Sequence, residues 1–222
     1  MESRSRRRLP GGPLYGAFKA AFITILALST RVRVVGLDRV PRTGGLLLVS
    51  NHLSFADPEI LVGIFPRPLT LMAKEELFRP WYSRLLAGLT GAAFPVRRGQ
   101  NDIRAVRDAL DLISAGAAVA VFPEGTRRIG GLGVAHRGVA YLATRARCPV
   151  LPVGIVGTEA IRTVWSLARR PSFEVHFGEP FMIEAADGSD QIVGQIMSRI
   201  AELLPNDRRG AYAAPSEAMR VG

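Results

Sequence analysis

A histidine and an aspartate stand five positions apart in the segment NHLSFADP, residues 51–58. A carboxylate that accepts a hydrogen bond from one imidazole nitrogen leaves the other nitrogen free to take a proton from a substrate hydroxyl. His52 and Asp57 are therefore a candidate general-base pair. The alternative is that Asp57 only caps a helix and that His52 is an ordinary loop histidine.

Pro58 bears on whether the two side chains can meet. On one continuous helix, five steps of ~100° would place His52 and Asp57 about 140° apart, on nearly opposite faces. Proline disfavours helical geometry at the residue before it and suits the first turn of a helix. The sequence therefore predicts a helix that begins at residue 58 with Asp57 as its N-cap, preceded by a turn that can fold His52 back onto the carboxylate.

Two arginine pairs extend the set of candidate residues. The segment GAAFPVRRG (91–99) ends an apolar run with Arg97 and Arg98, and FPEGTRR (122–128) follows another apolar run. Arginine suits bidentate binding of phosphate, and a glycine such as Gly125 permits close approach of the backbone. Both segments are candidate phosphate-binding loops, with a solvated strand end and an ordinary turn as the alternatives.

Short apolar runs rich in β-formers alternate with helix-length segments from residue 32 onward. Helical character is clearest over 102–115, 137–147 and 190–204. The apolar runs are 32–37, 46–50, 69–73, 92–96, 117–122, 150–156 and 173–177. This alternation predicts an α/β fold with a mostly parallel central sheet that is flanked by helices on both faces.

The polar motifs follow predicted strands. NHLSFADP comes after 46–50, the Arg97–Arg98 pair after 92–96, and PEGTRR after 117–122. Ligands of such sheets bind beyond the carboxyl ends of the strands, so we expect the three motifs to share one rim. Pro152 lies inside the predicted strand 150–156 and has no backbone donor, which predicts a strand that is at an edge or locally irregular near the cleft.

Residues 1–31 combine a basic start with an apolar stretch over 14–30. As a helix this stretch would rise ~26 Å, somewhat less than the ~30 Å hydrocarbon core of a bilayer, and Lys19 interrupts it. We expect a membrane-associating helix that anchors the protein, peripherally or by its N-terminus, on the cytoplasmic face of the cell membrane. A core helix, a true span and a cleaved signal peptide are the alternatives.

The length and composition fit one main domain. The chain has 222 residues, and we expect the domain to cover 32–204 and a flexible tail to cover 205–222. The net charge of +10 predicts an anionic partner, such as a membrane surface or a phosphorylated ligand. Nucleic acid is not expected, because no binding module or interleaved aromatic pattern is present. The single Cys148 allows no intramolecular disulfide.

Taken together and in this order, four segments resemble blocks of the glycerolipid acyltransferases, specifically the 1-acylglycerol-3-phosphate O-acyltransferase family. The segment from Asn51 to Asp57 resembles that family's NHx4D block. FPEGTR (122–127) is identical to its third block. The other matching positions are Gly91, Phe94 and Arg97 in a G-x-x-F-x-x-R block, 151–153 in a V-P-V block, and 177–180 in a further segment.

The resemblance implies roles for individual residues. His52 and Asp57 would be the catalytic pair, and the glycerol-phosphate part of the acceptor would be bound by Arg97, Glu124, Gly125, Thr126 and Arg127. Further candidates for the site are Asn51, Phe94, Arg98 and Pro152. The acyl group would pass directly from acyl-CoA or acyl carrier protein to the acceptor at the membrane, with no metal or organic cofactor. Neither Ser54 nor Cys148 would then be required as a nucleophile.

The resulting expectation is acylation of the free hydroxyl of 1-acylglycerol-3-phosphate, a lysophospholipid, to give phosphatidic acid in phospholipid biosynthesis. Two departures from the family pattern leave the acceptor open: Arg128 stands where serine is common, and 131–138 differs from a segment usually richer in lysine and phenylalanine. His136 is either a phosphate or interface contact or a surface residue. The alternatives are a same-fold enzyme acting on another lysolipid, such as lyso-ornithine lipid, and a non-catalytic protein that binds membrane surfaces.

Overall fold

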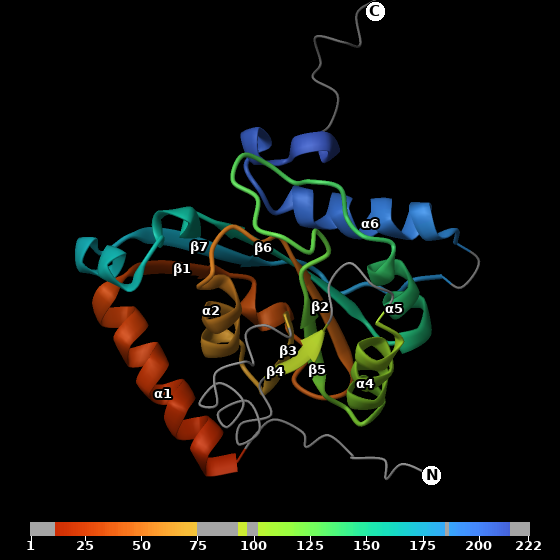
Figure 1. Ribbon diagram of the computed structural model, residues 1–222, viewed down its shortest axis with the longest axis horizontal. Coiled ribbons are helices and arrows are strands. Elements are labelled where there is room, and N and C mark those ends of the chain that lie inside the picture. Colours follow the sequence, from red (N-terminus) through yellow and green to blue (C-terminus); the bar gives the residue numbers. More distant parts are fainter. Residues whose placement is uncertain (1–11, 75–92, 97–101, 185–186, 214–222) are drawn as a thin grey trace, which may run out of the picture.

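A single seven-stranded sheet runs through the molecule (Figure 1). The computed structural model describes residues 12–74, 93–96, 102–184 and 187–213. Each apolar run predicted to be a strand is one. The strands are β1 (Arg31–Val35), β2 (Leu46–Ser50), β3 (Leu69–Lys74), β4 (Ala93–Val96), β5 (Ala118–Val121), β6 (Val150–Val156) and β7 (Ser172–Phe177).

The sheet has the order β1-β7-β6-β2-β5-β3-β4. All neighbouring strands are parallel except β6 and β7, whose pairing is antiparallel. The carboxyl ends of β2, β3, β4, β5 and β6 therefore share one edge of the sheet, which is where a parallel sheet presents its site. The predicted fold class, a mostly parallel α/β sheet, is confirmed.

Helices cover both faces of the sheet (Figure 1). They are α1 (Gly12–Ser29), α2 (Asp57–Ile64), α4 (Ile103–Ser114), α5 (Gly138–Ala146) and α6 (Ser189–Glu202). The three helices predicted most clearly from the sequence correspond to α4, α5 and α6. Short 3-10 helices complete the described chain: η1 (Leu37–Arg39), η3 (Thr158–Ala160), η4 (Val164–Arg169), η5 (Asn206–Arg208) and η6 (Gly210–Tyr212).

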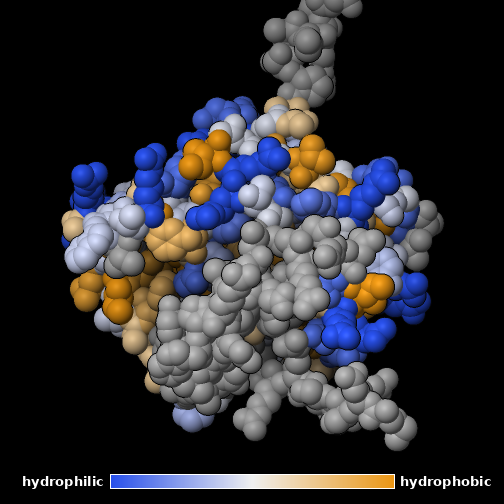
Figure 2. All heavy atoms as spheres, viewed as in Figure 1, coloured by the Kyte–Doolittle hydropathy of each residue, from blue (hydrophilic) through white to orange (hydrophobic). Residues whose placement is uncertain are grey.

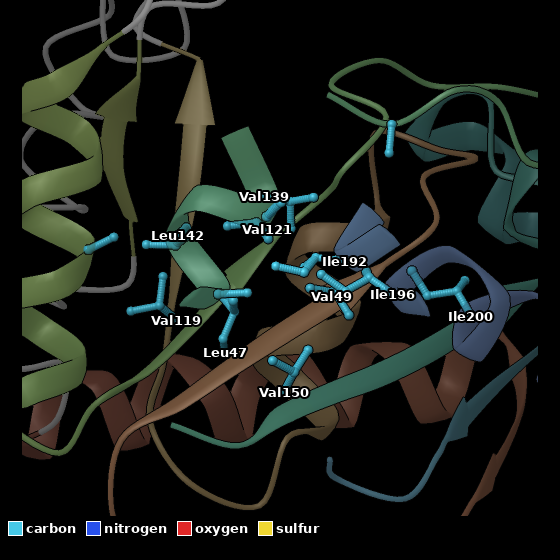
Figure 3. Packing of buried hydrophobic residues seen from close by; sticks show 14 of the residues in the cluster. Leu47, Val49, Val119, Val121, Val139, Leu142, Val150, Ile192, Ile196 and Ile200 are labelled. Carbon is cyan, nitrogen blue, oxygen red and sulfur yellow. The ribbon is translucent and has the colours of Figure 1, made fainter. Parts of the chain in front are cut away.

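The alternating side chains of the central strands build two cores. Leu47 and Val49 of β2 point toward α5 and α6 (Figure 3). Leu46 and Leu48 point to the other face, where they pack with residues of α1 and α2. All four are fully buried. A strand buried on both faces is apolar at every position, which is why β2 and β5 were recognisable as continuous runs.

Strand β6 corrects one expectation about Pro152. It lies between β7 and β2 in the interior of the sheet, so of the two predicted alternatives, an edge strand and a locally irregular one, the edge position is excluded. The local irregularity is present: paired residues of β6 and β7 begin at Val153, the Gly178 N–H donates to the Pro152 carbonyl, and the next contact is an isolated bridge at Val150. An interior position is possible because the regular β6–β7 pairing stops beside the proline.

Helix α1 packs along one side against α2 and the start of β3. The Phe22 ring contacts Gly63, the Lys19 ammonium donates to the Phe65 carbonyl, and the Leu69 N–H donates to the Tyr15 hydroxyl at 3.3 Å. The outer side of α1 is exposed. In the part of the chain that the structure describes, no helix combines the length and the apolar character needed to cross a bilayer.

The C-terminal region differs from the expected flexible tail over residues 206–213. The Leu132 N–H donates to the Arg208 carbonyl at 3.1 Å, and the Arg208 guanidinium forms an ion pair with Glu159 at 2.8 Å. Leu204 is buried and Tyr212 packs against the same core, so the chain is held at both ends of this stretch. Residues 214–222 lie outside the described residues.

Candidate active site

The motifs that follow β2 and β5 meet at one rim of the sheet, as predicted. The two strands are adjacent and parallel, so their carboxyl ends lie side by side. The Arg128 N–H donates to the His52 carbonyl at 2.8 Å, and the Phe122 ring stacks on the His52 imidazole with centroids 4.3 Å apart. Strand β4 ends at the same rim, but Arg97 and Arg98 lie outside the described residues.

His52 and Asp57 are hydrogen-bonded, with Nδ1 and Oδ2 2.9 Å apart. The same oxygen accepts the backbone N–H groups of Leu53, at 2.7 Å, and Ser54, at 2.8 Å. An oxygen surrounded by donors acts only as an acceptor, so the proton lies on Nδ1 and Nε2 is the nitrogen left for a substrate. Asp57 is fully buried and His52 is 7% exposed, which limits screening of the pair by water.

The predicted role of Asp57 as a helix cap is wrong. Helix α2 begins at Asp57 with Ala56 as its N-cap, and Pro58 is the second helical residue. The Ile60 N–H that a capping side chain at position 57 would accept already donates to the Ala56 carbonyl at 2.9 Å. The carboxylate instead turns back to the 52–54 turn. The other expectation, that the turn folds the imidazole onto the carboxylate, is confirmed.

Asn51 fastens the turn to the neighbouring strand. Its amide nitrogen donates to the Ile155 carbonyl at 2.8 Å, and its amide oxygen accepts the Ile155 N–H at 2.7 Å. Ser54 fastens the other side, because its hydroxyl donates to the Ile161 carbonyl at 2.8 Å. Asn51 is only 3% exposed, so we interpret it as a residue that positions the turn with His52.

Glu124 joins the turns that follow β2 and β5. Its carboxylate accepts the Gly133 N–H at 2.8 Å and also the backbone N–H of His52. Burial is the main cause that raises the pKa of Glu124, while these two hydrogen bonds and the charge of Arg128 oppose the shift. The cavity beside Asn51, Glu124 and Arg128 holds about 10 Å³, room for about one water molecule, so the turns are closely packed.

Gly125 has a left-handed backbone, with φ of 65°. A Cβ at this position would lie 2.8 Å from the His136 imidazole, so a side chain here would have to displace that ring as well as adopt a left-handed backbone. His136 belongs to the loop before α5, and its N–H donates to the Pro123 carbonyl at 2.9 Å. Thr126 is exposed on the same turn.

The remaining predicted residues fall in three places. Arg127 is exposed and directly precedes Arg128, whose backbone contacts His52. Pro152 is buried within β6, with its ring beside Gly178. The backbone of Phe94 belongs to β4, and its side chain is outside the described part of the structure.

Two groups with possible nucleophilic character are placed away from that role. Cys148 is buried just before β6 begins, at the edge of the sheet opposite His52, and burial raises the pKa of its thiol to about 11. The Ser54 hydroxyl is committed to the Ile161 carbonyl. The stacking of Phe122 on His52 was not predicted; its signal was an aromatic residue at the end of the strand beside β2.

Comparison with known proteins places this arrangement in a family. A family profile described as Acyltransferase matches residues 31–156. A 1-acyl-sn-glycerol-3-phosphate acyltransferase of Pseudomonas aeruginosa is 31% identical over 209 residues, which cover 89% of this chain and 79% of the relative. The enzyme of the same name from Bacillus subtilis is 28% identical over 162 residues, covering 72% and 78%.

Other comparisons cover less of the relative or show the fold alone. The match to the Borreliella burgdorferi 1-acyl-sn-glycerol-3-phosphate acyltransferase, at 27% identity, spans only 55% of that protein. The crystal structure of the Thermotoga maritima 1-acyl-sn-glycerophosphate acyltransferase superimposes with a TM-score of 0.66 at 22% identity, over 85% of this chain and 79% of that one. The matched region 31–156 contains both turns that surround His52, and this chain belongs to the acyltransferase family.

Proposed function

We propose that this protein transfers a fatty acyl group from acyl-CoA or acyl carrier protein to the free hydroxyl of 1-acylglycerol-3-phosphate, giving phosphatidic acid. The observation that carries the proposal is the buried 2.9 Å hydrogen bond between His52 Nδ1 and Asp57 Oδ2 at the rim of the sheet. The names of the relatives from Pseudomonas aeruginosa and Bacillus subtilis support this choice of acceptor.

The reaction follows from the free nitrogen of His52. Nε2 removes the proton of the acceptor hydroxyl while that oxygen attacks the thioester carbonyl carbon. The tetrahedral adduct collapses, the carbon–sulfur bond breaks, and the leaving thiolate takes the proton back from the imidazolium. General-base catalysis of this kind supplies a factor of about 10²–10⁴ in rate. The burial of Cys148 and the hydrogen bond made by Ser54 support direct transfer without an acyl-enzyme.

The exposed turn after β5 offers groups for the acceptor phosphate. We assign Arg127 and Thr126 to it, with Gly125 as the close-approach position and Arg97 and Arg98 as contributors from the chain after β4. For Glu124 we propose a role other than binding the glycerol-phosphate part of the acceptor, which the resemblance implied. Its carboxylate is buried, accepts backbone N–H groups and would repel a phosphate, so we assign it to positioning the turns.

The remaining parts of the proposal concern location and cofactors. Helix α1 would rest on the cytoplasmic face of the cell membrane with its exposed side, which carries Ile25 and Leu28. The transfer requires no metal or organic cofactor, because the thioester already activates the acyl group.

A second acceptor is kept because of Arg128. Its side chain folds over Gly133, where a Cβ would lie 2.4 Å from the arginine. Arg128 stands where serine is common in the family and lies beside the turn assigned to the acceptor phosphate, so this position could change the choice of lysolipid. Lyso-ornithine lipid is the alternative acceptor to be tested.

The test compares wild type with His52→Ala by thiol release from acyl-CoA, using lysophosphatidate, lyso-ornithine lipid and lysophosphatidylcholine as acceptors. We expect turnover with lysophosphatidate that falls about 10²–10⁴-fold in the variant. His176→Ala is the control, because His176 lies on β7 and its Nε2 is hydrogen-bonded to the Glu174 carboxylate. Equal turnover in His52→Ala would refute the mechanism, turnover with another lysolipid alone would replace the acceptor, and no thioester consumption would indicate a binding protein.

A further inference from the structure

The segment 161–171 between β6 and β7 carries an unusual surface. Trp165 is 86% exposed, the largest exposed fraction among the large hydrophobic residues that the structure describes. Three arginines in the segment, Arg162, Arg169 and Arg170, are also exposed, and the segment contains no acidic residue. Within the described ranges, none of these arginines forms an ion pair, so their charge is available to an outside partner.

The segment holds Trp165 outward through defined contacts. The Ser166 hydroxyl accepts the N–H groups of Arg162, at 3.3 Å, and Thr163, at 3.2 Å, which caps η4. Leu167 packs into the core on the face covered by α1 and α2. Ile161 is buried at the base of the segment, and its carbonyl accepts the Ser54 hydroxyl of the catalytic turn. The segment that carries Trp165 is therefore hydrogen-bonded at its base, through Ile161 and Ser54, to the turn that contains His52.

Apolar side chains of α1 continue this surface. Helix α1 packs beside η4 (Figure 1, lower and far left), and near its C-terminal end it exposes 57% of Ile25 and 72% of Leu28. On the left of Figure 2, orange apolar and blue polar residues lie side by side at this end of the molecule. We call Ile25, Leu28, Arg162, Trp165 and Arg169 the Trp165 surface.

The chemistry of the Trp165 surface matches an anionic bilayer. Tryptophan is amphipathic and is favoured at the level of lipid headgroups, exposed isoleucine and leucine gain from contact with acyl chains, and arginine binds lipid phosphate. We propose that the Trp165 surface docks on anionic lipid membranes, with Trp165 at headgroup level and the arginines on lipid phosphate, beside the contact made by the exposed end of α1. The purpose of this docking would be to bring the catalytic turn to a lipid acceptor, and that purpose rests on the proposed function.

Flotation of the 222-residue chain with vesicles tests the binding. We expect wild type to bind vesicles of phosphatidylglycerol mixed with phosphatidylcholine, and to bind phosphatidylcholine alone more weakly. Trp165→Ala should weaken binding about tenfold, since it removes a large inserting side chain. The matched control is Tyr141→Ala, because Tyr141 is also an exposed aromatic residue beside an arginine, Arg145, but lies on α5.

Charge substitutions test the arginines in the same assay. Arg162→Gln with Arg169→Gln should weaken binding to the anionic vesicles about fivefold for each arginine removed. The control pair is Arg104→Gln with Arg107→Gln, since both arginines are exposed on α4, on the other side of the sheet. An equal loss in the control pair, or in Tyr141→Ala, would overturn the proposal because binding would then follow total charge or aromatic content.

Fluorescence gives a second readout that does not depend on comparing affinities. The chain has two tryptophans, so in a Trp81→Phe background the emission comes from Trp165 alone. We expect a shift of this emission to shorter wavelength when anionic vesicles are added. Absence of vesicle binding by wild type, an unshifted emission, or unchanged flotation of Trp165→Ala would each refute the Trp165 surface.

The failure of this surface and the failure of the proposed function are distinguishable. Flotation requires no turnover, and turnover can be measured with detergent-dispersed lysophosphatidate, where no bilayer is present. We expect Trp165→Ala to keep wild-type turnover in detergent while it loses vesicle binding. A drop in detergent that matches the loss of vesicle binding would overturn the docking role, because Trp165 would then support the fold or the site itself.

Discussion

The imidazole of His52 is held by groups from separate parts of the chain. Asp57 fixes Nδ1 from the start of α2, Phe122 stacks on the ring from the end of β5, and Arg128 donates its N–H to the His52 carbonyl. In the proposed mechanism, such preorganisation keeps Nε2 in one orientation without a cost at the moment of reaction.

Glu124 gives the first prediction at the scale of single residues. If its role is to accept the N–H groups of His52 and Gly133, Glu124→Gln keeps an acceptor oxygen and should retain turnover within about tenfold, whereas Glu124→Ala should lose about 10²-fold because the turn shifts. Steady-state rates with lysophosphatidate distinguish the two variants. Equal losses in both would show that the charge of Glu124 acts on the substrate.

The same residue predicts part of the pH dependence of stability. Burial raises the pKa of Glu124 above the ordinary value of 4.5, so above that pH the folded protein holds a proton that the unfolded chain releases. This contribution is complete below pH 4.5 and is lost as the pH rises through the raised value. Glu124→Gln should remove that fall, and thermal unfolding at a series of pH values measures it.

For single residues, the sequence predicted which side chains come into contact more accurately than it predicted their hydrogen bonds. The spacing of His52 and Asp57, with Pro58 after them, predicted a turn that brings the two side chains together, and they are hydrogen-bonded. The predicted cap failed because the backbone carbonyl of Ala56 already satisfies the helix. The stacking of Phe122 depends on the order of β2 and β5 in the sheet, which no local pattern encodes.

At the scale of the elements, strand β2 pairs with β6, and directly after β2 the chain leaves the sheet to form the turn that contains His52. The paired residues of the two strands end at Ser50 and Val153, and the Asn51 amide then bonds both backbone groups of Ile155. The side chain thus continues the pairing after the backbone has turned away.

Asn51→Ala should therefore destabilise the protein. The change leaves two buried backbone groups of Ile155 without partners, and we expect the free energy of unfolding to fall by about 2–4 kcal/mol. Denaturant unfolding measures the change. Asn206→Ala is the control because Asn206 is exposed in η5, and a loss no larger than that of the control would contradict the assigned role of Asn51.

Element types were predictable where burial is complete. Strands buried on both faces are apolar throughout, which is why the runs that form β2, β5 and β6 were recognisable as strands. The direction of β7 and the interior position of β6 were not predictable, because both depend on which strands become neighbours. Within the expected tail 205–222, the polar composition of 206–213 gave no sign of the packing of Leu204 and Tyr212 against the core.

For the molecule as a whole, the C-terminal region packs against the loop that follows the candidate site. The loop that contributes Gly133 to Glu124 also donates, through Leu132, to the Arg208 carbonyl. A Cβ on Gly210 would lie 2.2 Å from the Leu132 carbonyl oxygen, so the two segments touch backbone to backbone. The last described part of the chain thereby supports the turn that follows β5.

Gly210→Ala should separate these segments. Gly44→Ala is a matched control, because both glycines have positive φ, 55° and 81°, while a Cβ on Gly44 would meet nothing within 4 Å. We expect the control to lose about 1–2 kcal/mol of stability from backbone strain, and Gly210→Ala to lose about 1–3 kcal/mol more from the steric clash. Equal unfolding free energies in the two variants would contradict the packing described.

We propose that the charge of Asp57 makes His52 a base, and a comparison of Asp57→Asn with wild type tests this. We expect turnover of acyl-CoA with lysophosphatidate to fall about 10²–10⁴-fold. The melting temperature should fall only slightly, because an asparagine oxygen can still accept the N–H groups of Leu53 and Ser54. Asp190→Asn, at an exposed ion pair with Arg137, is the control. Wild-type turnover in a folded Asp57→Asn protein would contradict the account.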